Sequence, residues 1–317
     1  MISKIEVWGD SILRGVVLDP ETRRYSRLKE ASCVALSSRA LGIPAENHAR
    51  FGMTSEKGRV VMEREIPAHA EGEAALIGFG GNDIDYDWRA VASDPHAEHL
   101  PHTPPKRFCE NMRAMVCLAR SRGMEPLLMT LPPIDAVRYY EWIGRDIEGK
   151  ENILVWLGDV QQIYRSHAAY NRLVVELARQ LGCRLVDLRA SFLENGDYRP
   201  YLCMDGIHPN AEGHALMERV FLNSVYTRSG QNSTPNSNAT NLHSSQKRCC
   251  SFCISSSNAS PTFQVQKSIF HQMTKPIQVT VILPLLLAIS FSRNDDIHSS
   301  ISGISNDLIG VIPTIGQ

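Results

Sequence analysis

The stretch Lys4-Ile-Glu-Val-Trp-Gly-Asp-Ser-Ile-Leu13 sets the pattern of this chain: an apolar run ends in glycine and is followed at once by small polar residues. Short runs of this kind, rich in β-branched and aromatic side chains, are typical of buried strands. The stretch therefore predicts a first strand that ends near Trp8, with Ser11 just beyond its carboxyl end.

Four further apolar runs alternate with amphipathic stretches. The predicted strands are 4–8, 43–48, 74–79, 126–130 and 184–187, and the predicted helices are 25–41, 55–65, 105–122, 160–181 and 210–226. Strands separated by helices indicate a parallel sheet covered on both faces. We therefore expect an α/β fold, namely a flavodoxin-like three-layer αβα sandwich with a five-stranded parallel sheet.

Four short motifs of small and polar residues stand in order along the chain. They are Gly9-Asp10-Ser11-Ile12, Arg50-Phe51-Gly52-Met53-Thr54, Gly80-Gly81-Asn82-Asp83 and Asp205-Gly206-Ile207-His208-Pro209. The first three each follow a predicted strand, and ligands of doubly wound sheets bind beyond the carboxyl ends of strands. We expect Ser11, Gly52 and Asn82 to meet at one edge of the sheet.

These motifs contain every group that serine ester hydrolysis needs. A serine hydroxyl such as that of Ser11 is a poor nucleophile until a base, here His208, accepts its proton. Asp205 stands three residues before His208, from where its carboxylate can bond the imidazole and fix its tautomer. Attack on an ester creates an oxyanion, for which the Gly52 N–H and the Asn82 amide are suitable donors.

In this order and with these neighbours, the motifs over residues 3–226 resemble the SGNH, or GDSL-type, serine hydrolase and esterase family. The resemblance implies the SGNH hydrolase fold and a catalytic triad of Ser11, Asp205 and His208. It also implies an oxyanion hole made of the Ser11 backbone N–H, the Gly52 backbone N–H and the Asn82 side-chain amide. We expect neither a cofactor nor a metal to take part.

The predicted function is serine-dependent hydrolysis of acyl esters through an acyl-serine intermediate. Acetyl and other small acyl esters, including those of carbohydrates, are the candidate substrates, and a lysophospholipase or thioesterase of the same family is an alternative. Two long connections, 84–104 and 131–159, are expected to wall the substrate cleft.

Two alternatives come from other functional classes. A dinuclear-metal phosphoesterase would use Gly9-Asp10 and Gly81-Asn82-Asp83, but it also needs an early Asp-x-His pair, which does not precede Asp10. The second alternative is a catalytically silent binding domain that keeps the fold.

Composition and charge limit the classes of partner that the protein is expected to bind. The formal net charge of −1 provides no global field that would attract nucleic acid or an anionic membrane. The amino terminus has the pattern of a strand rather than a signal peptide. The scattered cysteines of the first 228 residues predict free thiols in a reducing cytoplasm. We expect a cytoplasmic enzyme that acts on a small-molecule ester, and the oligomeric state is left open.

The composition changes after residue 228. The last Glu is Glu218 and the last Tyr is Tyr226, and from Ser229 onward Ser, Asn, Thr and Ile dominate. We expect a hydrolase domain over 1–228 and a low-complexity tail over 229–317 that is disordered or not native to the domain. The apolar run 277–291 is shorter than the roughly 20 apolar residues of a spanning helix, so no membrane anchor is expected.

Overall fold

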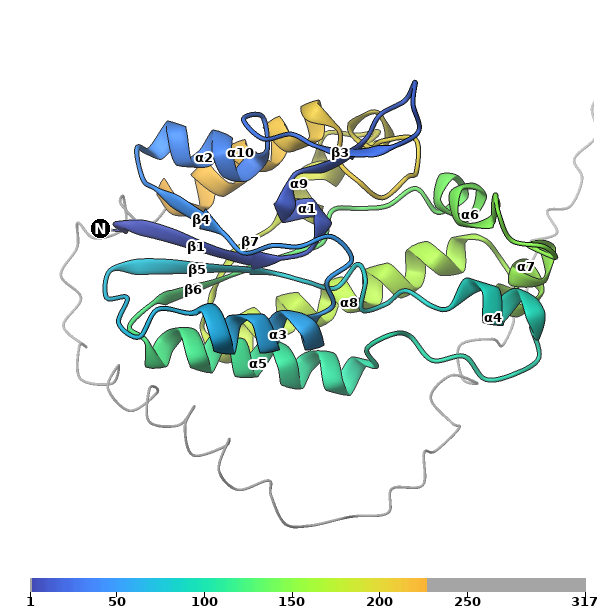
Figure 1. The fold of residues 1–317 in the computed structure, drawn as a ribbon, viewed down its shortest axis with the longest axis horizontal. Helices are drawn as coiled ribbons and strands as arrows, with labels where there is room; N and C mark the ends of the chain where they lie inside the picture. The colour runs from blue at the N-terminus through green and yellow to red at the C-terminus, as the bar shows by residue number, and fades with distance from the viewer. Residues whose placement is uncertain (1, 227–317) are drawn as a thin grey trace, which may run out of the picture. The chain divides into compact units, whose positions relative to one another are not determined.

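A computed structural model describes residues 2–226 and contains a five-stranded parallel sheet (Figure 1). Its strands are β1 (Lys4–Gly9), β4 (Ala45–Asn47), β5 (Glu73–Gly78), β6 (Glu125–Met129) and β7 (Arg184–Val186). They lie in the order β4-β1-β5-β6-β7, and every neighbouring pair is parallel. The strand order reverses between β1 and β5, which is where ligands of such sheets bind. The predicted fold class is confirmed.

Helices cover both faces of the sheet. Figure 1 shows α2 (Cys33–Leu41) and α10 (Ala211–Tyr226) on one face, and α3 (Ser55–Glu65), α5 (Pro105–Ser121) and α8 (Gln161–Leu181) on the other. The last four agree with their predicted ranges to within one residue at each end. Their limits follow ordinary helix signals, since α5 begins with Pro105 and α8 ends at Gly182 in the left-handed conformation.

The predicted helix over 25–41 is wrong in its first part. Tyr25–Arg27 instead forms strand β3, which pairs antiparallel with β2 (Val16–Leu18) in a separate two-stranded sheet. Helix α2 begins only at Cys33, because the Ser32 side chain caps it by accepting a hydrogen bond from the backbone N–H of Ala35 at 3.3 Å.

The connections that follow the strands carry short helices. They are α1 (Ser11–Arg14), α4 (Trp88–Ser93), α6 (Ala136–Gly144), α7 (Glu151–Leu157), α9 (Leu188–Glu194) and the 3₁₀ helix η1 (Arg199–Tyr201). Helices α4, α6 and α7 extend beyond the carboxyl ends of the strands (Figure 1). They pack through their own apolar cluster, which includes Trp88, Tyr139 and Ile153. The two long predicted connections are therefore partly helical.

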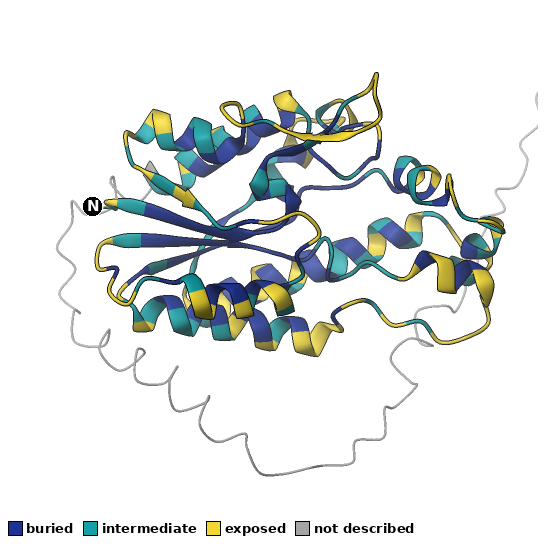
Figure 2. Cartoon of the chain, viewed as in Figure 1, coloured by how far each residue is buried: buried dark blue, intermediate teal, exposed yellow. Residues whose placement is uncertain are grey.

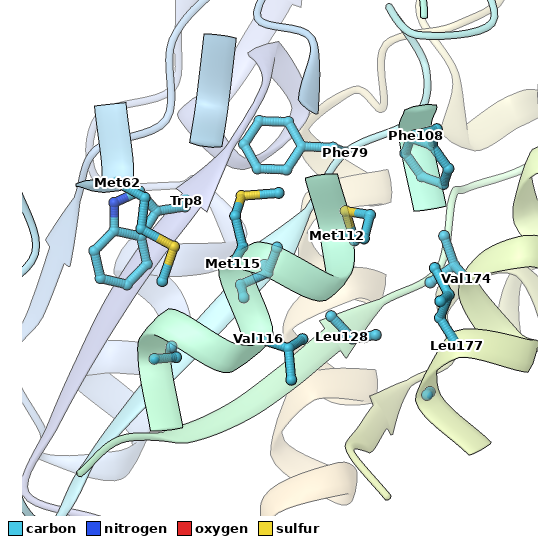
Figure 3. Close-up of a cluster of buried hydrophobic side chains, with 14 of the residues drawn as sticks. Trp8, Met62, Phe79, Phe108, Met112, Met115, Val116, Leu128, Val174 and Leu177 are labelled. Atoms are coloured by element: carbon cyan, nitrogen blue, oxygen red, sulfur yellow. The ribbon is translucent and has the colours of Figure 1, made fainter. Parts of the chain in front are cut away.

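Two apolar layers hold the sandwich together. Figure 2 shows the strands as buried and the outer helix faces as exposed. The larger cluster, between the sheet and α3, α5 and α8, contains Trp8, Phe79, Met112 and Leu128 (Figure 3). Burial of one such side chain contributes about 1.5–3 kcal/mol, so these two layers supply the main favourable term for folding.

The tail predicted over 229–317 lies outside the described residues. Within residues 2–226, no helix combines the length and apolarity that crossing a bilayer requires. None of the five cysteines of this part of the chain forms a disulfide, as the sequence predicts.

Gly58 on α3 provides a test of the packing in the larger cluster. A Cβ at this position would overlap the ring of Phe79, which is fully buried. Alanine stabilises a helix over glycine by about 0.5–1 kcal/mol, but overlap in a packed core costs about 1–3 kcal/mol. We expect Gly58→Ala to lower the free energy of unfolding, measured by denaturant titration.

The control for Gly58→Ala is Lys57→Ala, which changes an exposed residue of the same helix. It should be neutral or stabilising, because alanine is a strong helix former. Equal stability of Gly58→Ala and the unsubstituted protein would contradict the contact with Phe79.

Candidate active site

The hydroxyl of Ser11 is linked to two side chains that lie nearly two hundred residues further along the chain. Ser11 Oγ is 2.9 Å from Nε2 of His208, and Nδ1 of His208 is 2.7 Å from Oδ2 of Asp205. All three side chains are buried. The structure therefore brings together the three residues that the sequence suggested as nucleophile, base and orienting acid.

Ser11 stands where strand β1 turns into helix α1. The preceding Asp10 caps this short helix, because its Oδ1 accepts a hydrogen bond from the backbone N–H of Ile12 at 3.0 Å. Leu13 of the same turn is 1% exposed and packs in the core. The turn is fixed from both sides, and the Ser11 hydroxyl is held toward His208.

The loop of Asp205 and His208 is closed by backbone hydrogen bonds. Cys203 N–H donates to the His208 carbonyl at 2.8 Å, and Asp135 N–H donates to the Gly206 carbonyl at 2.8 Å. Gly206 has a φ of 75°, and a Cβ there would lie 2.6 Å from the Asp135 carbonyl oxygen. Only glycine fits this turn, which aims the carboxylate of Asp205 back at the imidazole.

Asp205 remains ionised although it is fully buried. Burial opposes its charge, but the His208 hydrogen bond and charge, together with the backbone N–H groups of Ile207 and His208, outweigh this cost and lower the pKa of Asp205. An ionised carboxylate at Nδ1 keeps a proton on that nitrogen. It leaves Nε2 of His208 as the acceptor for the Ser11 hydroxyl.

Asn82 follows strand β5, the neighbour of β1 in the sheet. Its side chain reaches the turn that carries Ser11. Its amide nitrogen lies 3.3 Å from the Met53 carbonyl and 3.4 Å from Oδ2 of Asp10. Both distances are long for hydrogen bonds, so the amide is weakly held and can turn to a better acceptor. The next residue, Asp83, anchors the loop by accepting from both the backbone N–H and the hydroxyl of Ser55.

Two backbone donors belong to the residues next in sequence to Asp10 and Met53, which this amide contacts. Gly52 lies in the exposed turn after β4 with a φ of 67°, a conformation that glycine adopts without strain. Within residues 2–226, the backbone N–H groups of Ser11 and Gly52 donate to no protein acceptor. Unpaired donors next to a nucleophile are suited to an anionic oxygen.

Asp10 is a site residue that the sequence analysis did not assign. It is 4% exposed, and burial raises its pKa to about 6, against the opposing effects of the Ile12 N–H and the His208 charge. Its contact with Asn82 could not be read from the sequence, because it depends on how two strand ends separated by some seventy residues meet.

Aromatic rings surround His208. The ring of Tyr25 lies edge-on with its centroid 5.1 Å from that of the imidazole, and the ring of Phe51 is nearly parallel to the imidazole at 6.1 Å. Tyr25 also contacts Trp142 of α6 at 6.1 Å. The sequence analysis missed Tyr25, because it placed this residue in a helix rather than on strand β3.

One group of possible metal ligands lies elsewhere, at the edge between β1 and β4. Glu6, Glu46 and His48 bring one ligand atom each within 4.8 Å of one another. The ammonium of Lys4 already pairs with both carboxylates, at 2.5 and 2.6 Å, and His48 Nε2 is 2.6 Å from Glu6. We interpret this group as a charge network that stabilises the sheet edge.

A comparison with family models agrees with this geometry. Residues 7–216 match the GDSL-like lipase/acylhydrolase family. The chain belongs to this family. The GDSL-like match spans all four motifs and both ends of the hydrogen-bonded chain from Ser11 to Asp205.

Curated relatives of this GDSL-like protein come from Arabidopsis thaliana. The GDSL esterase/lipase CPRD49 is 25% identical over 180 residues, covering 55% of this chain and 63% of the relative. The GDSL esterase/lipase At2g38180 is 24% identical over 197 residues, covering 61% of this chain and 56% of the relative. The chain thus spans less than two thirds of the length of these two relatives.

The chain is also similar to solved structures of other hydrolases. A lipase/acylhydrolase from Enterococcus faecalis has a TM-score of 0.48 at 19% identity, covering 72% of this chain and 97% of that chain. A catalytic mutant of an acetylxylan esterase from Geobacillus stearothermophilus has a TM-score of 0.48 at 19% identity, covering 70% of this chain and 94% of that chain.

The burial of Asp10 leads to a prediction on stability and pH. Its folded-state pKa of about 6 lies above the ordinary value of 3.8, so its contribution to stability is greatest below about pH 3.8 and is lost as the pH rises through about 6. Asparagine stays neutral throughout. We expect the melting temperature of Asp10→Asn to exceed that of the unsubstituted protein at pH 7.5, with the difference vanishing near pH 4.

Asp19→Asn is the matched control and should show the opposite sign. Hydrogen bonds from Thr22 lower the pKa of this exposed residue, so its charge favours the folded state at neutral pH. If the difference in melting temperature between Asp10→Asn and the unsubstituted protein did not change with pH, ionised Asp10 would not destabilise the folded state.

Proposed function

We propose that this protein is a serine-dependent carboxylic-ester hydrolase that works through an acyl-serine intermediate. The observation that carries the proposal is the continuous chain of hydrogen bonds from Ser11 Oγ through His208 to Asp205, at 2.9 and 2.7 Å. Membership of the GDSL-like lipase/acylhydrolase family and relatives named as esterases or lipases support it.

The first half of the proposed reaction acylates Ser11. His208 Nε2 takes the hydroxyl proton while Oγ attacks the ester carbonyl carbon, and the carbonyl oxygen becomes an oxyanion. The imidazolium is stabilised by the carboxylate of Asp205. When the tetrahedral intermediate collapses, His208 gives its proton to the departing alkoxide, and the alcohol leaves.

The second half hydrolyses the acyl-serine. Water occupies the position of the departed alcohol and loses a proton to His208 as it attacks the acyl carbon. Collapse of the second intermediate returns the proton to Ser11 Oγ and releases the carboxylic acid. The Ser11 and Gly52 N–H groups and the Asn82 amide would stabilise both oxyanions, because none of them is held by a strong acceptor before the charge develops.

The substrate we propose is a small-molecule ester with a small acyl group, with acetylated carbohydrates as one class. The rings of Tyr25, Phe51 and Trp142 gather beside His208 and offer faces on which a ring-shaped alcohol can stack. Lysophospholipids and thioesters remain alternatives, since the same chain of groups can cleave them.

The metal-dependent phosphoesterase is less well supported. It would need several ligands around Asp10 and Asn82, but among the described residues only Glu6, Glu46 and His48 form a group close enough to share an ion. That group lies at the β1–β4 edge and already pairs with Lys4.

Ser11→Ala tests the nucleophile. We expect it to lower kcat for p-nitrophenyl acetate by about 10⁴-fold or more, because no other group can form the acyl intermediate. The melting temperature should change little, and labelling by a fluorophosphonate should be lost. A variant that kept a tenth of the activity would remove Ser11 from the mechanism, and an unsubstituted protein that is not labelled would favour a silent binding domain.

Asn82→Ala tests the oxyanion donor. We expect kcat to fall by about 10²–10³-fold with little change in KM, because the amide bonds the oxyanion more strongly than the neutral carbonyl. Steady-state kinetics with p-nitrophenyl esters separates the two constants. A change confined to KM would mean that Asn82 only positions the substrate.

A further inference from the structure

The aromatic residues beside His208 mark the side of the site on which the alcohol leaves. A general acid must reach the departing oxygen, so in the proposed reaction the alcohol lies next to the His208 imidazole. Tyr25 and Phe51 are the rings that contact this imidazole, and they are 38% and 57% exposed. Their free faces are therefore accessible to the alcohol.

Three arginines stand around these two rings. Tyr25 and Arg27 are two residues apart on strand β3, so their side chains leave the same face of the hairpin. Arg50 directly precedes Phe51. Arg14 lies one helical turn after the nucleophile and donates from Nη1 to the Ala49 carbonyl at 2.9 Å.

These guanidinium groups lie close together. Arg27 donates from Nε to the backbone carbonyl of Arg14 at 3.3 Å. Burial and the charges of Arg27 and Arg50 together lower the pKa of Arg14. A cluster of like charges is unfavourable in a free protein, and a bound anion relieves it.

Two of these three arginines have no acidic partner among residues 2–226. Arg50 pairs with Glu65 at 2.6 Å, but within residues 2–226 neither Arg14 nor Arg27 makes an ion pair. Elsewhere in the domain, Arg107 and Arg199 are paired, with Glu56 and Asp197 respectively. Two unpaired guanidinium groups beside an exposed aromatic face form a binding surface for a flat or ring-shaped group that carries a negative charge.

We propose that the alcohol part of the substrate carries a carboxylate or a phosphate, which Arg27 and Arg14 bind while its ring packs on Tyr25 and Phe51. This inference rests on the proposed ester hydrolysis and adds a substrate class to it, namely acyl esters of anionic ring alcohols. Arginine suits both anions, because its planar fork bonds two oxygens at once.

The test compares acetyl esters of phenols that carry a different group, anionic or neutral, at the far end of the ring. The substrates are 4-acetoxybenzoate, 4-acetoxyphenyl phosphate and neutral 4-acetoxybenzamide. Each kcat/KM is divided by the rate of hydroxide-catalysed hydrolysis of the same ester, which removes differences in leaving-group reactivity. We expect the anionic esters to be favoured over the neutral one by about two- to fivefold, as solvent-exposed charge pairs allow. The stronger of the two indicates whether carboxylate or phosphate fits.

Arg27→Gln and Arg24→Gln form the matched pair of variants. Both remove one charge from the same hairpin, but Arg24 precedes the strand, next to the turn. We expect the ratio of anionic to neutral kcat/KM to fall toward one in Arg27→Gln and to stay at its original value in Arg24→Gln. Raising the ionic strength should lower the ratio in the unsubstituted protein as well.

The outcomes separate the two proposals. If the neutral ester is hydrolysed but the ratio is near one, or if both variants lower it equally, ester hydrolysis stands and the anion site is wrong. If none of the esters is hydrolysed and fluorophosphonate does not label Ser11, the proposed function itself fails, and the inference fails with it.

Discussion

The contact of Leu13 with the paired glycines at the ends of β1 and β5 is the constraint on which the site depends. Gly9 lies opposite Gly78 in the parallel ladder. A Cβ on Gly9 would be 2.6 Å from Cδ1 of Leu13, and a Cβ on Gly78 would be 2.8 Å from the same atom. Any side chain at either position would push Leu13, and with it the turn of Ser11, away from the sheet.

The same pairing brings Ser11 close to Asn82, the residues that we propose as nucleophile and oxyanion donor. Ser11 and Asn82 follow paired strand ends by only a few residues, so the connecting backbone has little conformational freedom. Asp10 then links the two loops, since its two oxygens face the Ile12 N–H and the Asn82 amide. The strand register and a few short contacts therefore position groups that are about seventy residues apart in sequence.

Most of the fold could be predicted because local signals and burial agree. Sheet strands β1, β5, β6 and β7 contain apolar runs, and α3, α5, α8 and α10 have clear caps or apolar periods. The hairpin β2–β3 could not be predicted from apolar period alone. Tyr25–Arg27 has no apolar alternation and is exposed, so its strand form depends on pairing with Val16–Leu18. The short helices α6 and α7 depend in the same way on packing in their own cluster.

Site residues could be predicted from the sequence where a chemical role suits one particular residue type. Serine, histidine and aspartate in this order suggested the contacts that Ser11, His208 and Asp205 make. The roles of Asp10, Tyr25 and Phe51 could not be predicted, because each depends on how separate loops approach one another. Tyr25 reaches His208 only because the hairpin after α1 folds back over the carboxyl edge of the sheet.

Three buried aspartates in this region show how surroundings, rather than residue type, decide charge. Asp205 has the imidazole and two backbone donors, which together outweigh burial and lower its pKa. Asp83 has the two donors of Ser55, yet burial still raises its pKa. Asp10 has one short donor and a distant amide, and burial raises its pKa to about 6. The weak pairing of Asp10 suits the proposed function, because a carboxylate that bound the Asn82 amide tightly would keep that amide from the oxyanion. The domain therefore tolerates a poorly paired charge beside the amide that we propose as an oxyanion donor.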